Sequence, residues 1–416
     1  MRLLKLELKR VLKTRMTVVL LLLSFGFSFL LAWLPTTFSR IKYTDEEGYE
    51  VELKGLESIR YEKEVQRDTA GDVTPEKVRR ALEQYQACLA KYKAETTYDL
   101  PEDVYVREIL PYSPLLHGVR EAYADPHTGI APSLMEIAPE ELDHFYEKCT
   151  ERNLSLMKQE QKDHEAAQNA GAAMYEKVEK PFRFFPGYGS DPMDYEILLT
   201  MLILLFGTVM IAPVFTSDYQ TGADDILRCT RYGKTKLAVI KVSSALLICG
   251  ATYFGCICIY LLVSNSLFGW ECTETSMQMI YSAMNLPDMS IGELQRFVAL
   301  GGLLSIIAAS ALTLFVSSAF KNVAASVSVS LLFCILPVVI YMALPTEIAN
   351  WIYPVLPAAG GAGLQASILY AAIDFDFWNI GNFALWLPYV MLWACALEIP
   401  LFIVLTIRSY LGNNER

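Results

Sequence analysis

Residues 197–215 read ILLTMLILLFGTVMIAPVF, and residues 216–236 read TSDYQTGADDILRCTRYGKTK, so an apolar stretch is followed directly by a polar one. An α-helix needs about 20 mainly apolar residues to cross the roughly 30 Å hydrocarbon core of a bilayer. The first stretch therefore predicts a membrane-spanning helix, and the second predicts a short polar connection to the next one. This alternation of apolar and polar stretches decides the fold class.

Six apolar stretches of this kind occur along the chain, at residues 17–34, 197–215, 237–263, 297–320, 323–344 and 383–407. The first follows six bases, as a secretory signal would, but its exit, Ala32-Trp33-Leu34-Pro35, holds no small-x-small cleavage site. We therefore expect an uncleaved anchor. The sequence predicts an α-helical polytopic membrane protein with six transmembrane helices.

Charge is concentrated in one block of the chain. Residues 36–196 hold 33 Asp and Glu against 20 Lys and Arg, whereas the rest of the chain holds 13 acids and 15 bases. The net charge of −11 excludes the basic face of a nucleic-acid-binding protein. The 12% of aromatic residues excludes a disordered chain. We predict that residues 35–196 form one large domain outside the membrane.

Lys and Arg in the short connections predict the orientation of the spans, because loops rich in these residues stay in the cytoplasm. With a cytoplasmic N-terminus, residues 1–16, 217–241, Lys321 and the C-terminal tail place 14 bases and five acids inside. The short outer loops then hold seven acids and one base, Arg296. The sequence predicts a plasma-membrane protein with both termini in the cytoplasm and residues 35–196 outside the cell.

Apolar residues in the outer block recur at helical spacing. Thr74-Pro75 predicts the start of one helix, with Thr as N-cap and Pro at the first helical position. A second, longer helix is predicted from Pro139 to about Val178, since no proline interrupts that stretch after its start. Residues 40–66 alternate weakly and fit either strand or coil. We therefore expect a mainly helical extracellular domain between spans one and two.

Two segments outside the spans are also predicted to meet the membrane. Residues 1–16 have the pattern of an amphipathic helix in the cytoplasmic interface, with bases near anionic headgroups at Lys5, Lys9, Arg10 and Lys13. The alternative is that these bases only set the topology. Residues 345–382, within the five-helix region 197–416, are apolar but broken by prolines and glycines. They predict short helices that dip into the outer leaflet like a re-entrant segment.

Motifs that would carry chemistry are missing from the sequence. His164-Glu165 is followed by Gln168 where a zinc motif needs a second His, and Gly233-Lys234-Thr235 has Arg228 where a phosphate loop needs Gly. Cys88 and Cys149 either bridge the two predicted helices or remain buried free thiols. We predict no catalytic residue, no metal site and no cofactor bound by this chain.

The polar connection 216–236 is the best candidate for a functional segment. Residues 217–229 predict a short amphipathic helix, followed by a glycine-bearing turn and a basic run that enters the third span. Ile226 and Leu227 are apolar on an otherwise polar segment. Such a helix suits docking onto a cytoplasmic partner, and it equally suits a solvated connector held near the headgroups by its bases.

The connection is similar to the loop of ABC transporter permeases of the six-span export family. The resemblance lies in the acidic-aromatic-x-x-Gly start at 218–222, in Leu227-Arg228 followed by Arg-x-Gly, and in the Lys at the entrance of the next span. The basic N-terminal segment, the six spans with both termini inside and the broken segment 345–382 also match. A large insert after the first span resembles permeases of Gram-positive bacteria, including those that export antimicrobial peptides or give immunity to them.

The resemblance implies a coupling helix that docks into a groove on a separate ABC ATPase subunit, and that subunit would bind ATP and Mg²⁺. The residues implied at this docking site are Asp218, Tyr219, Gly222, Asp225, Leu227 and Arg228, with Gly233 and Lys234 shaping re-entry into the membrane. The resemblance also implies a second permease copy, as a homodimer or heterodimer in the lipid bilayer. The expected substrates are antimicrobial peptides or lipid-like molecules.

Glu398 lies inside the predicted sixth span, just before Pro400. A carboxylate at that depth usually faces a bundle interior or water. It either lines a translocation path or dimer seam, or it pairs locally or is neutral and structural. The alternative to a transporter is a multi-span receptor or scaffold whose acidic outer domain binds an extracellular ligand. Such a protein needs no ATPase, and its 217–236 loop would tolerate charge reversal.

Overall fold

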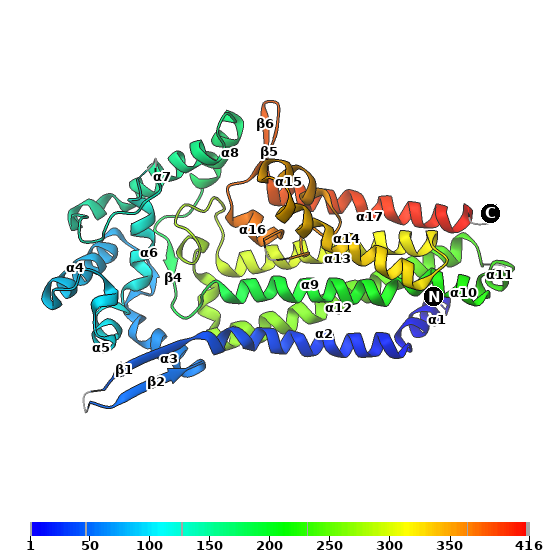
Figure 1. Ribbon diagram of the computed structural model, residues 1–416, viewed down its shortest axis with the longest axis horizontal. Helices are drawn as coiled ribbons and strands as arrows, with labels where there is room; N and C mark the ends of the chain where they lie inside the picture. The colour runs from blue at the N-terminus through cyan, green and yellow to red at the C-terminus, as the bar shows by residue number, and fades with distance from the viewer. Residues whose placement is uncertain (1, 46–47, 126–127, 231, 364, 413–416) are drawn as a thin grey trace.

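The computed structural model describes residues 2–45, 48–125, 128–230, 232–363 and 365–412. The protein is mainly helical and elongated, with long helices side by side and a large domain, residues 39–190, at one end (Figure 1). The first and last described residues lie at the opposite end. The two ends of the helix bundle are called the domain end and the termini end below.

Six helices in the described part of the chain are long and apolar enough to cross a membrane. They are α2 (Arg15–Trp33), α9 (Asp191–Ile211), α12 (Thr235–Phe268), α13 (Ile291–Ala319), α14 (Val323–Ala343) and α17 (Leu387–Gly412). This bears out the prediction of a mainly helical chain with six membrane-spanning helices. The predicted start of the sixth span is wrong, because residues 383–386 form a strand and the helix begins at Leu387.

Close approaches between helices hold the bundle together. A Cβ on Gly302 of α13 would lie 2.3 Å from Tyr253 Oη of α12. A Cβ on Gly361 would lie 2.5 Å from Thr200 Cγ2 of α9. Both positions therefore need glycine, which lets neighbouring backbones approach as small residues commonly do between membrane helices. Residues around Gly361 consequently lie inside the bundle, against α9 and α13.

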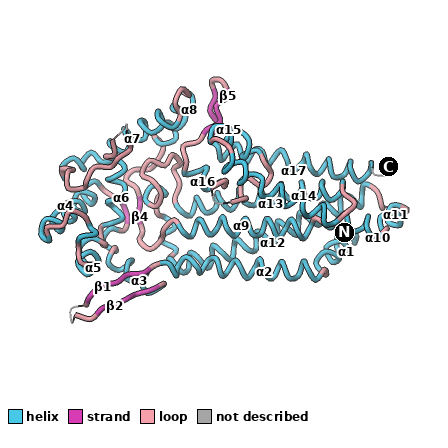
Figure 2. Tube along the Cα trace, viewed as in Figure 1, coloured by secondary structure: helices cyan, strands magenta, loops and turns pink. Residues whose placement is uncertain are grey.

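The large domain is built mainly from short helices, and its strands form two small antiparallel pairs (Figure 2). Strand β1 pairs with β2, with Arg40 opposite Lys54, and β3 pairs with β4. The strands and helices of this domain are β1 (Arg40–Thr44), β2 (Glu50–Lys54), α3 (Leu56–Val65), β3 (Gly71–Asp72), α4 (Pro75–Tyr92), α5 (Glu102–Val104), α6 (Ser113–Ala122), α7 (Phe145–Glu160), α8 (Glu165–Tyr175) and β4 (Arg183–Phe184).

The sequence predicted helix α4 better than the long helix expected over residues 139–178. The hydroxyl of Thr74 accepts a hydrogen bond from Lys77 N, as expected of an N-cap at the start of α4. The single helix expected from 139 to 178 is wrong, because it is divided into α7 and α8 by a turn in which Asp163 has a φ of 66°. Cys88 and Cys149 are both buried, and both are free thiols.

The large domain packs directly onto the domain end of the bundle. Gln161 Nε2, at the turn after α7, donates to Phe375 O at 2.8 Å. Asn153 Nδ2 and Tyr175 Oη donate to Met284 O and Ala283 O in the connection between α12 and α13, each at 2.9 Å. One apolar core runs without interruption from the large domain into the spans. The domain is therefore an extension of the bundle and not a separate module on a linker.

The remaining connections at the domain end are short and folded. Ser290 and Glu293 form a capping box at the start of α13. Residues 345–386 form α15 (Thr346–Ile352), α16 (Ile368–Ile373), and the hairpin of β5 (Phe377–Ile380) and β6 (Phe383–Trp386). At the termini end, α1 (Arg2–Leu12) precedes α2 after a short turn.

Candidate functional site

The polar connection after α9 folds as two short helices at the termini end. Helix α10 (Pro213–Thr221) continues from α9, and α11 (Ala223–Arg228) follows it. Gly222 separates them with a φ of 69°, a left-handed conformation that glycine adopts at little cost and that commonly ends a helix. The prediction of one helix over 217–229 is therefore wrong.

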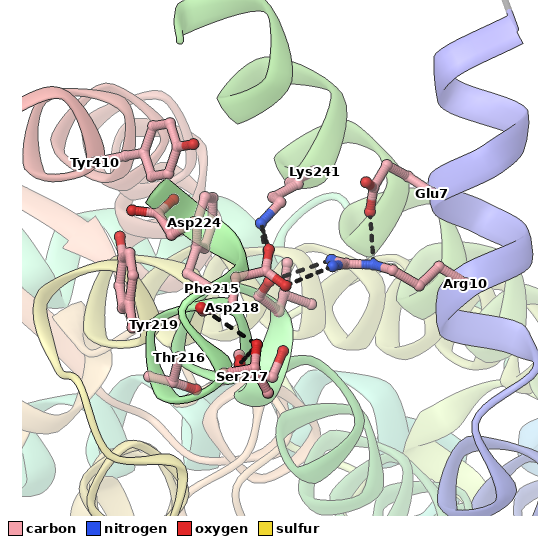
Figure 3. Close-up of polar contacts among 12 residues, drawn as sticks. Glu7, Arg10, Phe215, Thr216, Ser217, Asp218, Tyr219, Asp224, Lys241 and Tyr410 are labelled. Carbon is pink, nitrogen blue, oxygen red and sulfur yellow. Dashed lines mark hydrogen bonds and ion pairs between the residues drawn. The ribbon is translucent and has the colours of Figure 1, made fainter. Parts of the chain in front are cut away.

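Asp218 on α10 lies at the centre of a partly buried group of charges (Figure 3). Its Oδ1 accepts from Arg10 Nη1 of α1 at 2.8 Å, and its Oδ2 contacts Lys241 Nζ of α12. The Lys241 side chain is completely shielded from solvent, and that of Asp218 is 8% exposed. Arg10 Nε also pairs with Glu7 at 3.0 Å. Three segments far apart in the sequence thus meet at one carboxylate.

This charge cluster, defined as Glu7, Arg10, Asp218 and Lys241, contains two acids and two bases and is neutral overall. A buried charge needs a partner and further hydrogen bonds to offset its lost hydration. Arg10 and Lys241 both have a second acceptor, Val214 O, at 3.3 and 3.4 Å. Lys241 also lies over the Phe215 ring, 4.9 Å from its centroid. The cluster therefore fixes the position of α10 relative to α1 and α12.

A second polar contact joins α11 to the end of α17. Arg228 Nε pairs with Asp224 Oδ2 at 2.5 Å, and the guanidinium carbon lies 4.3 Å from the centroid of the Tyr410 ring. The Tyr410 hydroxyl donates to Gly233 O at 3.0 Å. A Cβ on Gly233 would lie 1.7 Å from Leu227 O, so only glycine fits there. The turn between α11 and α12 is thus held against the last span.

Hydrogen bonds between side-chain hydroxyls and backbone atoms join α10 to α13 and α14. Ser317 Oγ of α13 donates to Ala212 O at 2.6 Å and accepts from Phe215 N at 3.1 Å. Ser326 Oγ of α14 also donates to Ala212 O, at 3.2 Å. Tyr219 Oη donates to Ser318 O at 3.3 Å. Together with the charge cluster and the Arg228–Tyr410 contact, these hydrogen bonds join the α10–α11 segment to α1, α12, α13, α14 and α17 at the termini end.

The free surface of this segment is the tip formed by α11 and the following turn. Ile226 is 73% exposed, which is unusual for an isoleucine on a short, otherwise polar helix. Asp225 is exposed beside it, and Tyr232 and Lys234 are exposed on the following turn. These four residues, called the α11 tip below, form a small surface with an apolar centre and charges of both signs.

The structure divides the eight docking residues predicted from the sequence. Asp218, Tyr219, Arg228 and Gly233 have the internal contacts described above, so they position the segment. Gly222, Asp225 and Lys234 are exposed, and Leu227 is half-buried.

The bases of the predicted interfacial helix, α1, are not all alike in the structure. Lys5, Lys9, Arg10 and Lys13 are all exposed, and Arg10 also pairs with Asp218 and Glu7 in the charge cluster. Sequence reasoning missed Glu7, Asp224, Lys241 and Tyr410. Lys241 alone gave a signal, because it is a base placed after the start of an apolar span.

Glu398 lies half-buried on α17, a long way along that helix from the contacts that Tyr410 makes with the α10–α11 segment. Its Oε2 is buried and has no hydrogen-bond partner among the residues that the structure describes. Glu398 forms no ion pair with a described residue either, so local pairing is not seen, while the path or seam and the neutral structural role both stay open.

Comparison of the chain with protein-family models, with curated protein sequences and with solved structures finds no match. The geometry alone therefore describes the site. It is a short exposed apolar tip on a segment that is firmly joined to the ends of five helices. Such an arrangement is suited to receiving a contact and passing a displacement to the bundle.

Proposed function

We propose that this chain is the membrane-spanning permease subunit of an ATP-driven ABC exporter. In this proposal the α11 tip docks into a groove on a separate ATPase subunit, which binds ATP and Mg²⁺. The permease itself performs no hydrolysis. Two permease copies and two ATPase subunits form the transporter, and substrate passes between the two permease copies.

The distribution of charge supports a cytoplasmic location for the α11 tip. The described parts of two segments rich in Lys and Arg, residues 2–16 and 217–241, lie at the termini end together with the end of α17 (Figure 1). The short connections at the domain end are acidic. Because basic loops remain in the cytoplasm, this favours a cytoplasmic termini end and an extracellular large domain.

The observation that carries the proposal is the contrast between the exposed Ile226 and the contacts of the residues around it. In this proposal the exposed Ile226 side chain is the apolar anchor that a groove on the ATPase subunit would bury. The charge cluster and the Ser317 hydrogen bonds hold α10, and the Arg228–Tyr410 contact holds α11, so that the α10–α11 segment contacts five other helices. A movement of a docked ATPase would therefore displace the ends of the spans and not only a loop.

The test is to purify the tagged full chain in mild detergent and identify stoichiometric partners by mass spectrometry. The proposal predicts an ATPase subunit whose turnover changes when this chain is present. A chain that purifies without any nucleotide-binding partner would contradict it. The large domain would then be examined as a ligand-binding region of a receptor or scaffold.

A further inference from the structure

A pocket of about 490 Å³ lies where the large domain meets the domain end of the bundle. Its lining combines residues of α3 and α6 with residues 187–192, which lead into α9, and with the end of α12. The volume falls within the roughly 300–1,000 Å³ that is typical of pockets for small molecules. A small molecule in this pocket would contact the large domain and the bundle at the same time.

Aromatic rings form part of the pocket wall. Phe184, Tyr188 and Phe268 line the pocket, and all three are buried. The rings of Tyr188 and Phe268 pack edge to face, with their centroids 5.5 Å apart. Tyr188 Oη also accepts a hydrogen bond from Gln295 Nε2 of α13 at 2.9 Å. The wall is therefore fixed in position, and aromatic rings both bury apolar groups and attract cations.

The charged residues of the lining are acidic. Glu62 of α3 and Asp191 of α9 line the pocket, and no Lys or Arg of the described residues does so. Glu62 Oε1 accepts a hydrogen bond from Gln66 Nε2 at 3.3 Å. Burial raises the pKa of Glu62 above its usual range, and the hydrogen bond from Gln66 offsets only part of this effect. A cation in the pocket would supply the counter-charge that a buried carboxylate needs.

The base closest to Glu62 in the sequence is directed elsewhere. Lys63 Nζ donates to Phe268 O at 2.9 Å and pairs with Glu271. His117 lines the pocket from α6, and its Nε2 lies 3.6 Å from Glu121. The pocket thus combines two carboxylates with an aromatic wall. A ligand that complements both features has one positive charge and an apolar body.

We propose that this pocket binds a small organic cation, an alkylammonium ion with an apolar or aromatic body. The ammonium group pairs with Glu62, the more buried of the two carboxylates, and Asp191 adds negative potential at the exposed side. The body of the ligand lies against the rings of Phe184, Tyr188 and Phe268. The proposal rests on the pocket and not on the proposed transport function, because binding is measured without an ATPase subunit.

The test measures binding of dansylcadaverine to the purified full chain by fluorescence anisotropy in mild detergent at neutral pH. This probe carries a primary ammonium group on an aromatic body, and its N-acetyl derivative has the same body without the charge. The chain should bind the amine several-fold more tightly than the acetyl derivative. Glu62→Gln should remove that preference. The matched control is Glu64→Gln, on the same helix, because Glu64 is exposed and does not line the pocket.

Equal affinity for the two compounds, or an unchanged preference in Glu62→Gln, would overturn the proposal. The position of the amine is tested separately on the unsubstituted chain. A water-soluble carbodiimide joins a bound primary amine to an adjacent carboxylate through an amide bond. The dansyl label is expected on Glu62 and Asp191 in preference to Glu64. Label spread evenly over the exposed carboxylates of the large domain would show general charge attraction only and would overturn the site.

Discussion

Lys241 of α12 and Asp218 of α10 form an ion pair in which the lysine has no exposed side-chain surface. The two residues lie on either side of the α11 tip along the chain, and Arg10 of α1 adds a second cation to the same carboxylate. The pair therefore joins the N-terminal helix, the α10–α11 segment and the third span at one point. The contribution of this ion pair to the stability of the fold can be measured without any ATPase subunit.

Asp218→Asn is expected to destabilise the protein strongly. The substitution leaves Lys241 buried without its counter-charge, and removing one partner of a buried ion pair typically costs about 3–5 kcal/mol. Replacing both residues, as Asp218→Asn with Lys241→Met, should recover most of that loss because no unpaired charge remains. Thermal unfolding of the detergent-solubilised full chain measures both variants. A double variant as unstable as the single one would contradict this assignment.

Glycines 222 and 233 are expected to differ in their tolerance of alanine. Gly233→Ala places a Cβ against Leu227 O and should prevent the turn from α11 into α12 from forming. Gly222→Ala meets no neighbouring atom within 4 Å, so it carries only the left-handed backbone penalty of about 1 kcal/mol. The expression level and melting temperature of each variant test this order. Equal behaviour of the two variants would argue against the close approach of Gly233 to Leu227.

Tyr410→Phe should loosen the α11–α12 turn while the bundle remains intact. The variant keeps the ring under Arg228 but loses the hydrogen bond to Gly233 O, which is worth about 1 kcal/mol. Trypsin should then cleave faster at Lys234 and Lys236. The matched control is Tyr389→Phe, an exposed tyrosine of the same helix, which should leave the cleavage rate unchanged.

Asp374, in the connection between α16 and β5, should make stability depend on pH. Burial, with help from the negative charges of Asp376 and Glu160, raises the pKa of Asp374 to about 7. A raised folded-state pKa means that this group favours folding at low pH. Its contribution is present below about pH 4 and is lost as the pH rises through 7.

Asp374→Asn cannot ionise, so it does not lose stability as the pH rises. The substitution should therefore raise the melting temperature at pH 8 but not at pH 4. One pKa unit corresponds to about 1.4 kcal/mol, so a gain of a few kcal/mol is the upper limit. Fluorescence-monitored unfolding over this pH range checks the prediction. Asp68→Asn, at an exposed position of the large domain, is the control and should show no such difference.

Patterns of apolar residues predicted the architecture well, because each span and each capped helix is determined locally. The six membrane-spanning helices and the Thr74 cap are of this kind. The end of α7 was missed because neither proline nor glycine marks it at residues 161–164, and it lies beside a contact with a distant segment. Gln161 donates to Phe375, which follows it by more than two hundred residues.

The docking residues were predicted less well because the sequence does not show which polar side chains turn inward. Asp218 and Arg228 look like surface residues of a polar loop, but their partners Lys241, Arg10 and Tyr410 come from other helices. The sequence marked Ile226 and Leu227 equally as apolar residues in a polar segment, and only Leu227 was among the predicted docking residues. The structure leaves Ile226 exposed and Leu227 half-buried, a difference that depends on long-range pairing and could not be seen in the sequence.

The most direct test of the central claim is the binding of the ATPase subunit to Ile226→Asp. The substitution alters the exposed apolar centre of the α11 tip and none of the contacts that hold the segment. The matched control is Ile130→Asp, because Ile130 is 70% exposed in the large domain. We predict that Ile226→Asp abolishes co-purification of the ATPase and transport-coupled turnover, whereas Ile130→Asp retains both. Full retention of ATPase binding by Ile226→Asp would contradict the account.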